Sequence, residues 1–458
     1  MNEDGSRRWI RPKPSHGAWW HRRRVVAYAL MALFFIAPHL RLFGKPIFLM
    51  DLPHRQFTLM GYTFLPTDTL LFMFVLGSGV IGIFLLTAFF GRAWCGWACP
   101  QTVYLEFLFR PIGRWFDGGY TGSRNLDKQH AWFTPRRIGK YITFFLLSLF
   151  VSHTLLAFFV GTENLYHWVL TSPSQHPSAF FFVVVFTGIV WFNFTYFREQ
   201  TCLIVCPYGR WQSALIDRQS VIVAYDATRG EPRAHGVAHR DPAAGDCIDC
   251  GACVQTCPTG IDIRNGLQME CVHCTQCIDA CDDVMTRINK PTGLIRYSSQ
   301  DAMAGQPRKL LRPRTVLYPL VLVVLLTGLV TALVTKAPAD VTVLRGLGAP
   351  FTEEADGRIA NQIRIKITNR RGTSEQYTMT VSGLAGTDLK PQDITVVAPE
   401  NPLVVAGGAT RLTSVFILLP RSAFTAGERH VDLVFTDGRG YAETDGYRLL
   451  GPATGGAR

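Results

Sequence analysis

Five stretches of the 458-residue chain are rich in apolar side chains and contain no Asp, Glu, Lys or Arg, namely residues 25–40, 69–90, 141–160, 179–197 and 316–334. A helix needs about 20 apolar residues to cross the hydrocarbon core of a bilayer, and four of the stretches meet that length. The first is shorter and needs its flanks, and the 24 residues before it argue against a cleaved signal peptide. The pattern predicts a five-span α-helical bundle, with a basic arm at 1–24, four spans within 25–197 and the fifth at 315–335.

Two further segments have a different pattern. Residues 198–314 lose the apolar runs and gain Cys, Asp and Pro, which predicts a soluble domain inserted between helices, with a loop at 226–246. Residues 340–450 alternate apolar and polar side chains, as short strands do, at 363–368, 377–381 and 431–435. We expect an immunoglobulin-like β-sandwich without cysteine in this segment, followed by a tail at 451–458.

Lys and Arg are distributed unevenly between the loops. Three arginines, at 22–24, directly precede the first stretch, eight basic residues lie in the loop at 91–140, none lies at 161–178, and four lie at 308–314. Because short basic loops stay on the cytoplasmic side, we expect a bacterial inner-membrane protein with a cytoplasmic N-terminus and inserted domain, and a periplasmic β-sandwich. Topology and attraction to anionic membrane lipid account for the net charge of +12, so nucleic-acid binding is not needed to explain it.

Eight of the twelve cysteines form two runs, each with the spacing CxxCxxCxxxC. This is the spacing of bacterial two-cluster ferredoxins, in which the fourth cysteine of each run ligates the other cluster. We therefore expect two 4Fe-4S clusters in an α+β ferredoxin-like domain, one held by Cys247, Cys250, Cys253 and Cys281, the other by Cys271, Cys274, Cys277 and Cys257. Zinc is the alternative metal, which the duplicated order disfavours. Asp282 stands where the second run would usually carry Pro.

The other four cysteines form two CxxxCP motifs, at the ends of the second and fourth predicted spans: Cys95, Cys99, Cys202 and Cys206. Both spans run toward the cytoplasm in the predicted topology, so the four sulfurs can converge at one membrane face. Thiolates select Cu(I), and four-sulfur sites also suit zinc or another cluster, so the motif leaves the metal open. His39 and His153 lie in or beside spans, where haem or copper ligation competes with interhelical hydrogen bonding.

With these motifs the chain resembles the CcoG/FixG/RdxA family, accessory proteins for assembly of cbb3-type cytochrome c oxidase. The resemblance covers nearly the whole length and includes the β domain and both cluster runs, together with the segments 51–57, 94–100, 202–207 and 290–297.

The resemblance implies a cupric reductase, in which electrons pass through the clusters to Cu(II) and the Cu(I) formed goes to the oxidase. The catalytic, copper-handling residues would be Cys95, Cys99, Cys202 and Cys206. The implied partners are the copper ion, a copper transporter or chaperone, and oxidase assembly factors, with an electron donor that the sequence does not identify. Two alternatives are a NapH/NosR-like quinol dehydrogenase that serves a periplasmic partner, and a non-enzymatic scaffold that senses redox state.

Overall fold

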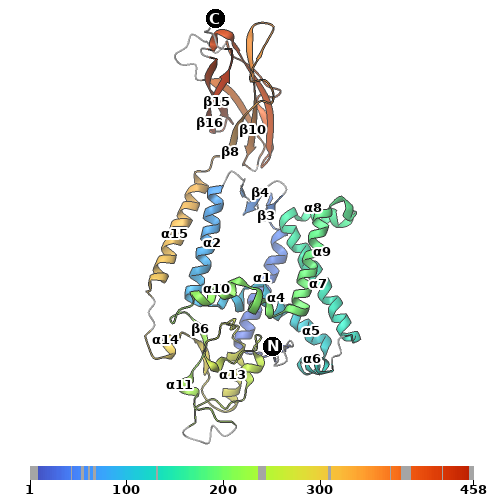
Figure 1. Ribbon diagram of the computed structural model, residues 1–458, viewed down its shortest axis with the longest axis vertical. Coiled ribbons are helices and arrows are strands. Elements are labelled where there is room, and N and C mark those ends of the chain that lie inside the picture. The colour runs from blue at the N-terminus through green and yellow to red at the C-terminus, as the bar shows by residue number, and fades with distance from the viewer. Residues whose placement is uncertain are drawn as a thin grey trace. The chain divides into compact units, whose positions relative to one another are not determined.

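The computed structural model describes residues 9–42, 44–52, 56–59, 62–64, 69–129, 133–235, 244–307, 311–371, 373–382, 393–424 and 427–452. The chain divides into two compact units. One comprises Met1–Leu40, Pro46–Arg55 and Pro66–Val330, and the other Arg41–Lys45, Gln56–Leu65 and Thr331–Arg458. The first unit carries all the cysteines, helices α1 to α14 and most of α15. The second carries the β-sandwich (Figure 1).

Within the described residues, four helical segments are long and apolar enough to cross a membrane: Leu70–Phe90, Pro135–Val160, Pro177–Phe197 and Pro313–Val334. They correspond to α2 (Thr69–Phe90), α7 (Pro135–Val160), α9 (Pro177–Phe192) with its π-helical extension η4 (Asn193–Phe197), and α15 (Pro313–Val334). Pro fits the first turn of α7 and α9 because the first helical N–H groups have no intrahelical acceptor. Four of the five predicted spans are thus supported by length and composition.

The first predicted span differs from the structure. Helix α1 runs over Ala18–Ile36, and a 3-10 turn, η1 (Ala37–His39), follows it. The helix therefore begins before the apolar stretch, so its first turns carry the three arginines at 22–24. The backbone N–H groups of Trp19 and Trp20 donate to the Asp279 carboxylate at 3.0 and 2.7 Å, which satisfies two free donors at the helix start. An acid distant in sequence thus caps α1, a contact that no local pattern indicates.

The loop predicted at 91–140 is mostly helical. Between α2 and α7 lie α3 (Ala93–Trp97), α4 (Pro100–Tyr104), the π-helix η2 (Leu105–Phe109), α5 (Arg110–Asp117) and α6 (Gly119–Lys128). Phe109 stacks on Phe194 with ring centroids 4.1 Å apart and meets Phe144 edge-on at 5.0 Å. These rings join η2 to α7 and η4. After α7 come α8 (Thr162–Leu170) and η3 (Pro173–Gln175).

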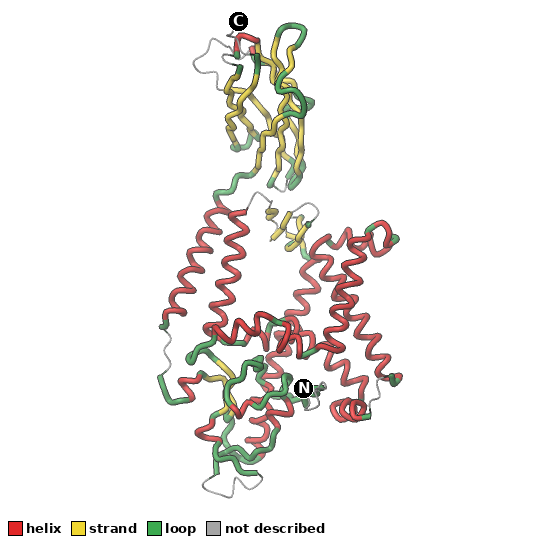
Figure 2. The backbone as a smooth tube through the Cα atoms, in the orientation of Figure 1, coloured by secondary structure: helices red, strands yellow, loops and turns green. Residues whose placement is uncertain are grey.

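Helices α2 and α15 lie side by side (Figure 2), where Gly77 meets Leu325 and Gly328 meets the ring of Phe74. Glycine at both positions lets the two helices approach closely.

The inserted domain after α9 is small and mixed, as the α+β prediction requires. It contains η5 (Thr201–Val205), α10 (Pro207–Leu215), β6 (Ile222–Tyr225), α11 (Ala227–Gly230), α12 (Ala252–Thr256), η6 (Ile263–Asn265), α13 (Gln276–Arg287), β7 (Ile295–Ser298) and α14 (Gln300–Met303). Strands β6 and β7 pair antiparallel, from Ile222 opposite Ser298 to Tyr225 opposite Ile295. The predicted loop at 226–246 holds one helical turn, α11, and its residues 236–243 lie outside the described part.

The second unit contains two packed sheets, which confirms the predicted sandwich. One has the order β12-β14-β10-β8 with β9 beside β10, and the other β13-β11-β15-β16. Ile363 and Ile365 of β10 face Leu433 and Phe435 of β15 in a core where each is at most 2% exposed, as the two-residue period predicts. The strands are β8 (Ala339–Arg345), β9 (Thr352–Glu353), β10 (Arg358–Asn369), β11 (Glu375–Ser382), β12 (Thr395–Val397), β13 (Leu403–Val405), β14 (Thr410–Pro420), β15 (Glu428–Thr436) and β16 (Ala442–Leu450), with a 3-10 turn η8 (Arg421–Ala423).

Short strands also occur between α1 and α2: β1 (Arg41–Leu42), β2 (Lys45–Pro46), β3 (Phe48–Asp51), β4 (Gln56–Leu59) and β5 (Tyr62–Phe64). Three residues of the family segment 51–57, at 53–55, lie outside the described part.

Candidate functional site

The fourth cysteine of the second run lies beside the first run. Burial, followed by the neighbouring Cys253, Asp282, Cys247 and Cys250, raises the pKa of Cys281 to about 12. A thiol can be affected in this way only by charges close to it. The structure thus brings Cys281 to the three cysteines with which the sequence groups it.

The fourth cysteine of the first run likewise lies beside the second run. Cys257, the last cysteine of the first run, raises the pKa of Cys271, Cys274 and Cys277, in each case after burial as the main cause. The same four thiols line a small cavity of about 20 Å³, which Cys253 also borders. Each group therefore offers four sulfur donors from two separate segments, a donor set that fits a cubane cluster.

Asp282 has a structural role in the second run. Helix α13 continues through it to Arg287, and its carboxylate accepts the backbone N–H of Gly293 at 2.8 Å. Proline at 282 would remove a helix hydrogen bond and lose this contact. In the first run, by contrast, helix α12 ends at Thr256, just before Cys257 and Pro258.

Each CxxxCP motif breaks the helix at its second cysteine. Cys99 and Cys206 have extended ψ angles of 125° and 110°, and α4 and α10 begin at the prolines that follow. Proline disfavours helical backbone in the residue before it and is well tolerated at the first helical position. Each second cysteine therefore lies at the start of a new helix, where the chain turns.

The four thiols of the two motifs lie near one another. Burial raises the pKa of Cys95 to about 12, with Arg92 lowering it and Cys99 and Cys206 raising it. Burial, followed by Cys99, Cys95 and Cys206, raises the pKa of Cys202 to about 12. Metal-free, these two thiols are protonated at neutral pH. Nowhere in the described part of the chain do three His, Cys, Asp or Glu side chains meet closely enough to hold one ion.

Sequence reasoning missed two residues beside the first motif: Gln212 contacts the motif, and Thr87 contacts Gln212. Cys95 Sγ donates to Gln212 Oε1 at 3.0 Å, and Gln212 in α10 is completely buried. Gln212 Nε2 in turn lies 3.5 Å from Thr87 Oγ1 in α2. The only sequence signal for Gln212 is its place six residues after Cys206.

The first motif is in direct contact with the second ferredoxin run. A methyl group added at Gly96 would lie 2.6 Å from the carbonyl oxygen of Val272 and 2.7 Å from that of His273, so only glycine fits. The backbone N–H of Arg92 donates to His273 Nδ1 at 3.1 Å. Burial, followed by Arg92, lowers the pKa of His273 to about 3, so its imidazole is neutral and can accept this bond.

Arg23 joins the same two segments from α1. This fully buried guanidinium donates from Nε to the carbonyl of Gly96 at 2.9 Å and from Nη1 to the carbonyl of Cys274 at 2.7 Å. Trp97 Nε1 adds a hydrogen bond of 2.9 Å to the hydroxyl of Tyr297 in β7. The segment holding Cys95 is therefore fixed against the loop that carries Cys271 and Cys274.

The two histidines singled out in the sequence do not join this site. His39 is exposed in η1. The Nδ1 atom of His153 lies 2.8 Å from the Leu149 carbonyl one turn earlier in its own helix, which supports a structural role. Within the described residues, neither histidine is a partner of Cys95 or Cys202.

A two-run cysteine domain fixed to membrane-length helices, followed by an immunoglobulin-like sandwich, defines a membrane iron–sulfur protein. Comparisons with protein families agree. Residues 197–300 match a 4Fe-4S dicluster domain, residues 72–118 a 4Fe-4S binding domain, and residues 329–452 the IG-like fold at the C-terminal of FixG. The only cysteines within 72–118 are Cys95 and Cys99.

The chain belongs to the FixG/RdxA family. Protein RdxA of Cereibacter sphaeroides is 33% identical, covering 91% of this chain and 89% of RdxA, and Protein RdxB of the same organism is 32% identical, covering 91% and 88%. Nitrogen fixation protein FixG of Rhizobium meliloti is 28% identical, covering 94% and 90%.

A crystal structure of a FixG-related protein from Vibrio parahaemolyticus matches with 15% identity, covering 25% of this chain and 98% of that one, at a TM-score of 0.22. RdxA and RdxB confirm the family that the motifs predicted.

The crossed arrangement predicts which cluster each variant damages. Anaerobically purified protein should contain about eight irons per chain, with two interacting cubane clusters in its reduced EPR spectrum. Cys281→Ser should weaken the cluster nucleated by Cys247, Cys250 and Cys253, and Cys257→Ser the other one. Damage confined to each variant's own run would disprove the crossing. About twelve irons would indicate a third cluster at the CxxxCP motifs.

The contact at Gly96 predicts a sharp difference between two glycine-to-alanine changes. Gly96→Ala should cost about 1–3 kcal/mol, because the new methyl group collides with two backbone carbonyls. Hydrogen exchange at residues 271–274 should then rise, and the thermal midpoint should fall by several degrees. Gly79→Ala in α2 is the control, since its methyl group would meet no atom within 4 Å. Equal behaviour of the two variants would show that the contact is absent.

Proposed function

We propose that this protein is a cupric reductase that reduces Cu(II) to Cu(I) at Cys95, Cys99, Cys202 and Cys206, for assembly of the copper centre of a cbb3-type oxidase. One observation carries the proposal. The segment holding Cys95 lies in van der Waals contact with the loop between Cys271 and Cys274. An electron leaving the second cluster site thus has only a short path to the thiols.

The chemistry of the thiols favours this reaction. When bound, the two clusters supply single electrons, and Cu(II) + e⁻ → Cu(I) consumes one. Soft thiolates bind Cu(I) in preference to harder ions, so they raise the tendency of Cu(II) to be reduced. A pair of sulfurs is enough for Cu(I), so the site does not need three ligands in place beforehand. Arg92 lowers the pKa of Cys95, which helps this thiol to give up its proton to the metal.

The cluster ligands follow from the same arrangement. We assign Cys247, Cys250, Cys253 and Cys281 to one cluster and Cys271, Cys274, Cys277 and Cys257 to the other. The mutual pKa effects of these thiols support the two groups. The second group is the one beside Gly96, which makes it the immediate donor to copper.

The proposed orientation has the N-terminus, the segment 91–140 and the ferredoxin-type domain in the cytoplasm, and the sandwich in the periplasm. The basic loops support it, with eight Lys and Arg at 91–140 and none at 161–178. In this orientation copper is reduced at the cytoplasmic face of the inner membrane. Copper transporters or chaperones and oxidase assembly factors are then the expected partners. A C-terminal reporter active only in the cytoplasm would contradict the orientation.

Double substitutions test the copper site. Cys95→Ala with Cys99→Ala, or Cys202→Ala with Cys206→Ala, should leave iron content unchanged, because these thiols lie outside both cluster groups. Cu(II) should oxidise the reduced protein about tenfold more slowly or slower still, as measured by the return of cluster absorbance. Copper binding should also fall. Met73→Ala, which removes an exposed sulfur near the start of α2, is the control. Unchanged copper binding and reduction in both double variants would remove the assignment.

A cavity favours quinol oxidation as a second candidate function. About 760 Å³ in volume, it is lined by α1, α7, α9 and both CxxxCP segments. Tyr104 lines it, is only 8% exposed, and its hydroxyl has no hydrogen-bond partner among the described residues. Asn193 and Gln101, which bond each other at 2.6 Å, also line it. An apolar ring that carries an oxygen acceptor suits such a cavity.

Tyr104→Phe separates the two candidates. If a quinol gives two electrons and two protons here, one electron to each cluster, the loss of this hydroxyl should slow reduction of the clusters by a short-chain quinol about tenfold. Cu(II) reduction should not change. Tyr28→Phe, at an exposed position of α1, is the control. Failure of wild-type clusters to exchange electrons with any quinone would eliminate the second candidate. A wild-type protein that reacts with neither acceptor would favour the scaffold alternative.

A further inference from the structure

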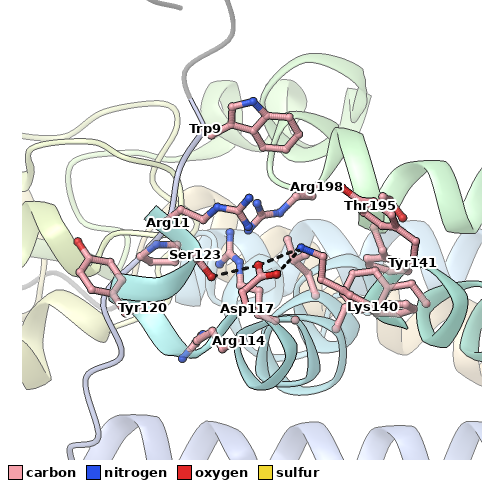
Figure 3. A pocket seen from close by; sticks show the side chains of 17 residues that line it. Trp9, Arg11, Arg114, Asp117, Tyr120, Ser123, Lys140, Tyr141, Thr195 and Arg198 are labelled. Carbon is pink, nitrogen blue, oxygen red and sulfur yellow. Dashed lines mark hydrogen bonds and ion pairs between the residues drawn. The ribbon is translucent and has the colours of Figure 1, made fainter. Parts of the chain in front are cut away.

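A second cavity, of about 60 Å³ and bordered by charged side chains, lies away from the thiols, where the N-terminal segment meets α5, α6, α7 and η4 (Figure 3). A water molecule needs about 10–15 Å³ of cavity volume, so this cavity has room for about four or five heavy atoms, the size of a phosphate group. Among the residues described there, the charged side chains that line it are one carboxylate, Asp117, and five cations, Arg11, Arg110, Arg114, Lys140 and Arg198.

The single carboxylate is already engaged. Lys140 Nζ lies 2.9 Å from both oxygens of Asp117, and the hydroxyl of Ser123 donates to one of them at 3.1 Å (Figure 3). Further acids pair with the arginines without lining the cavity. Arg11 binds Asp127 at 2.8 and 3.2 Å. The charged side chains that face the cavity are therefore mostly cationic.

Arg110 likewise pairs with acids that do not line the cavity. Its side chain is 5% exposed and pairs with Glu106 and with Glu199, the latter at 3.1 Å. Figure 3 shows the side chains of Arg11 and Arg198 reaching toward each other above Asp117. Two guanidinium groups in that arrangement are stabilised by an anion between them.

Two buried donors at the cavity have no acceptor. The Nε of Arg110 and the hydroxyl of Thr195 have no hydrogen-bond partner among the described residues, and both residues line the cavity. A buried donor left unsatisfied is costly, so native structures usually supply a partner. A tetrahedral oxyanion would provide several acceptor oxygens at once.

The position along the helices fits a lipid headgroup. Lys140 and Tyr141 lie in the first two turns of α7, and Thr195 lies near the end of the Pro177–Phe197 segment. Both are ends of candidate membrane helices, the level at which phosphate headgroups and basic residues meet. Phe109, Phe144 and Phe194 form an apolar wall of the same cavity.

We propose that this cavity is a binding site for a phosphate group, presented by an anionic phospholipid or as free inorganic phosphate. The proposal is independent of the copper assignment, because none of its residues is one of the thiols. Arg114 and Thr195 are suited to hold the phosphate without carrying the fold. Among the described residues, Arg114 has a partly exposed side chain and a long ion pair of 3.7 Å, and the Thr195 hydroxyl has no hydrogen-bond partner.

The test uses the full-length protein in detergent and native mass spectrometry with three probes: short-chain phosphatidylglycerol, short-chain phosphatidylcholine and inorganic phosphate. Arg114→Gln and Thr195→Val are compared with Arg287→Gln, whose side chain is 74% exposed on α13. We expect the wild-type protein to bind phosphatidylglycerol in preference to phosphatidylcholine. Relative to wild type, phosphatidylglycerol should bind about tenfold more weakly to Arg114→Gln and several-fold more weakly to Thr195→Val, and its binding to Arg287→Gln should be unchanged.

Each outcome decides the proposal. Variant-sensitive binding of phosphatidylglycerol supports it and identifies the lipid as the source. Variant-sensitive binding of inorganic phosphate alone supports it and identifies free phosphate. The proposal is overturned if wild-type protein binds neither phosphatidylglycerol nor inorganic phosphate. It is also overturned if wild type, Arg114→Gln and Thr195→Val bind them equally. Thermal midpoints of the variants within about 2 °C of wild type show that any loss of binding is local and not caused by unfolding.

Discussion

Gly96 meets the carbonyl oxygens of Val272 and His273 so closely that no side chain fits between them. This approach joins a segment that follows a membrane-length helix to the loop between two cysteines of a soluble domain. Arg23 donates to carbonyls on both sides of the contact, and its buried charge favours extra negative charge nearby. The distance between the second cluster site and the thiols depends on this backbone contact and on the hydrogen bonds around it, and so does the proposed transfer of electrons.

Buried charges hold the rest of that interface together. Arg110 pairs with Glu106 and Glu199 and reaches the carbonyl of Pro258 at 3.5 Å, directly after Cys257. Burial alone would raise the pKa of Glu106, but Arg110 and Arg114 lower it to about 2. A carboxyl whose folded pKa is lowered stabilises the fold above its unfolded pKa and loses that contribution as the pH falls through the folded value. The interface should therefore be insensitive to pH near neutrality.

The two candidate functions share one arrangement and differ in the molecule that exchanges electrons with it. The CxxxCP segments carry four thiols near one another and also border a large apolar cavity. Copper chemistry uses the sulfurs, whereas quinol chemistry uses the cavity and the hydroxyl of Tyr104, which has no hydrogen-bond partner in the described part of the chain. Both need the contact at Gly96, since each requires electrons to move between this segment and the ferredoxin-type domain.

The sequence alone determined the features that depend on local spacing. The cysteine runs, the apolar stretches, the two-residue period of the sandwich and the family all follow from residues near one another in the chain. Tertiary structure decided the contacts made over long separations. Asp279 caps α1, Gln212 binds Cys95, and five basic side chains meet around one carboxylate. A pattern in the chain reports which face a residue presents, but the partner on that face is chosen by packing, so only the folded structure reveals it.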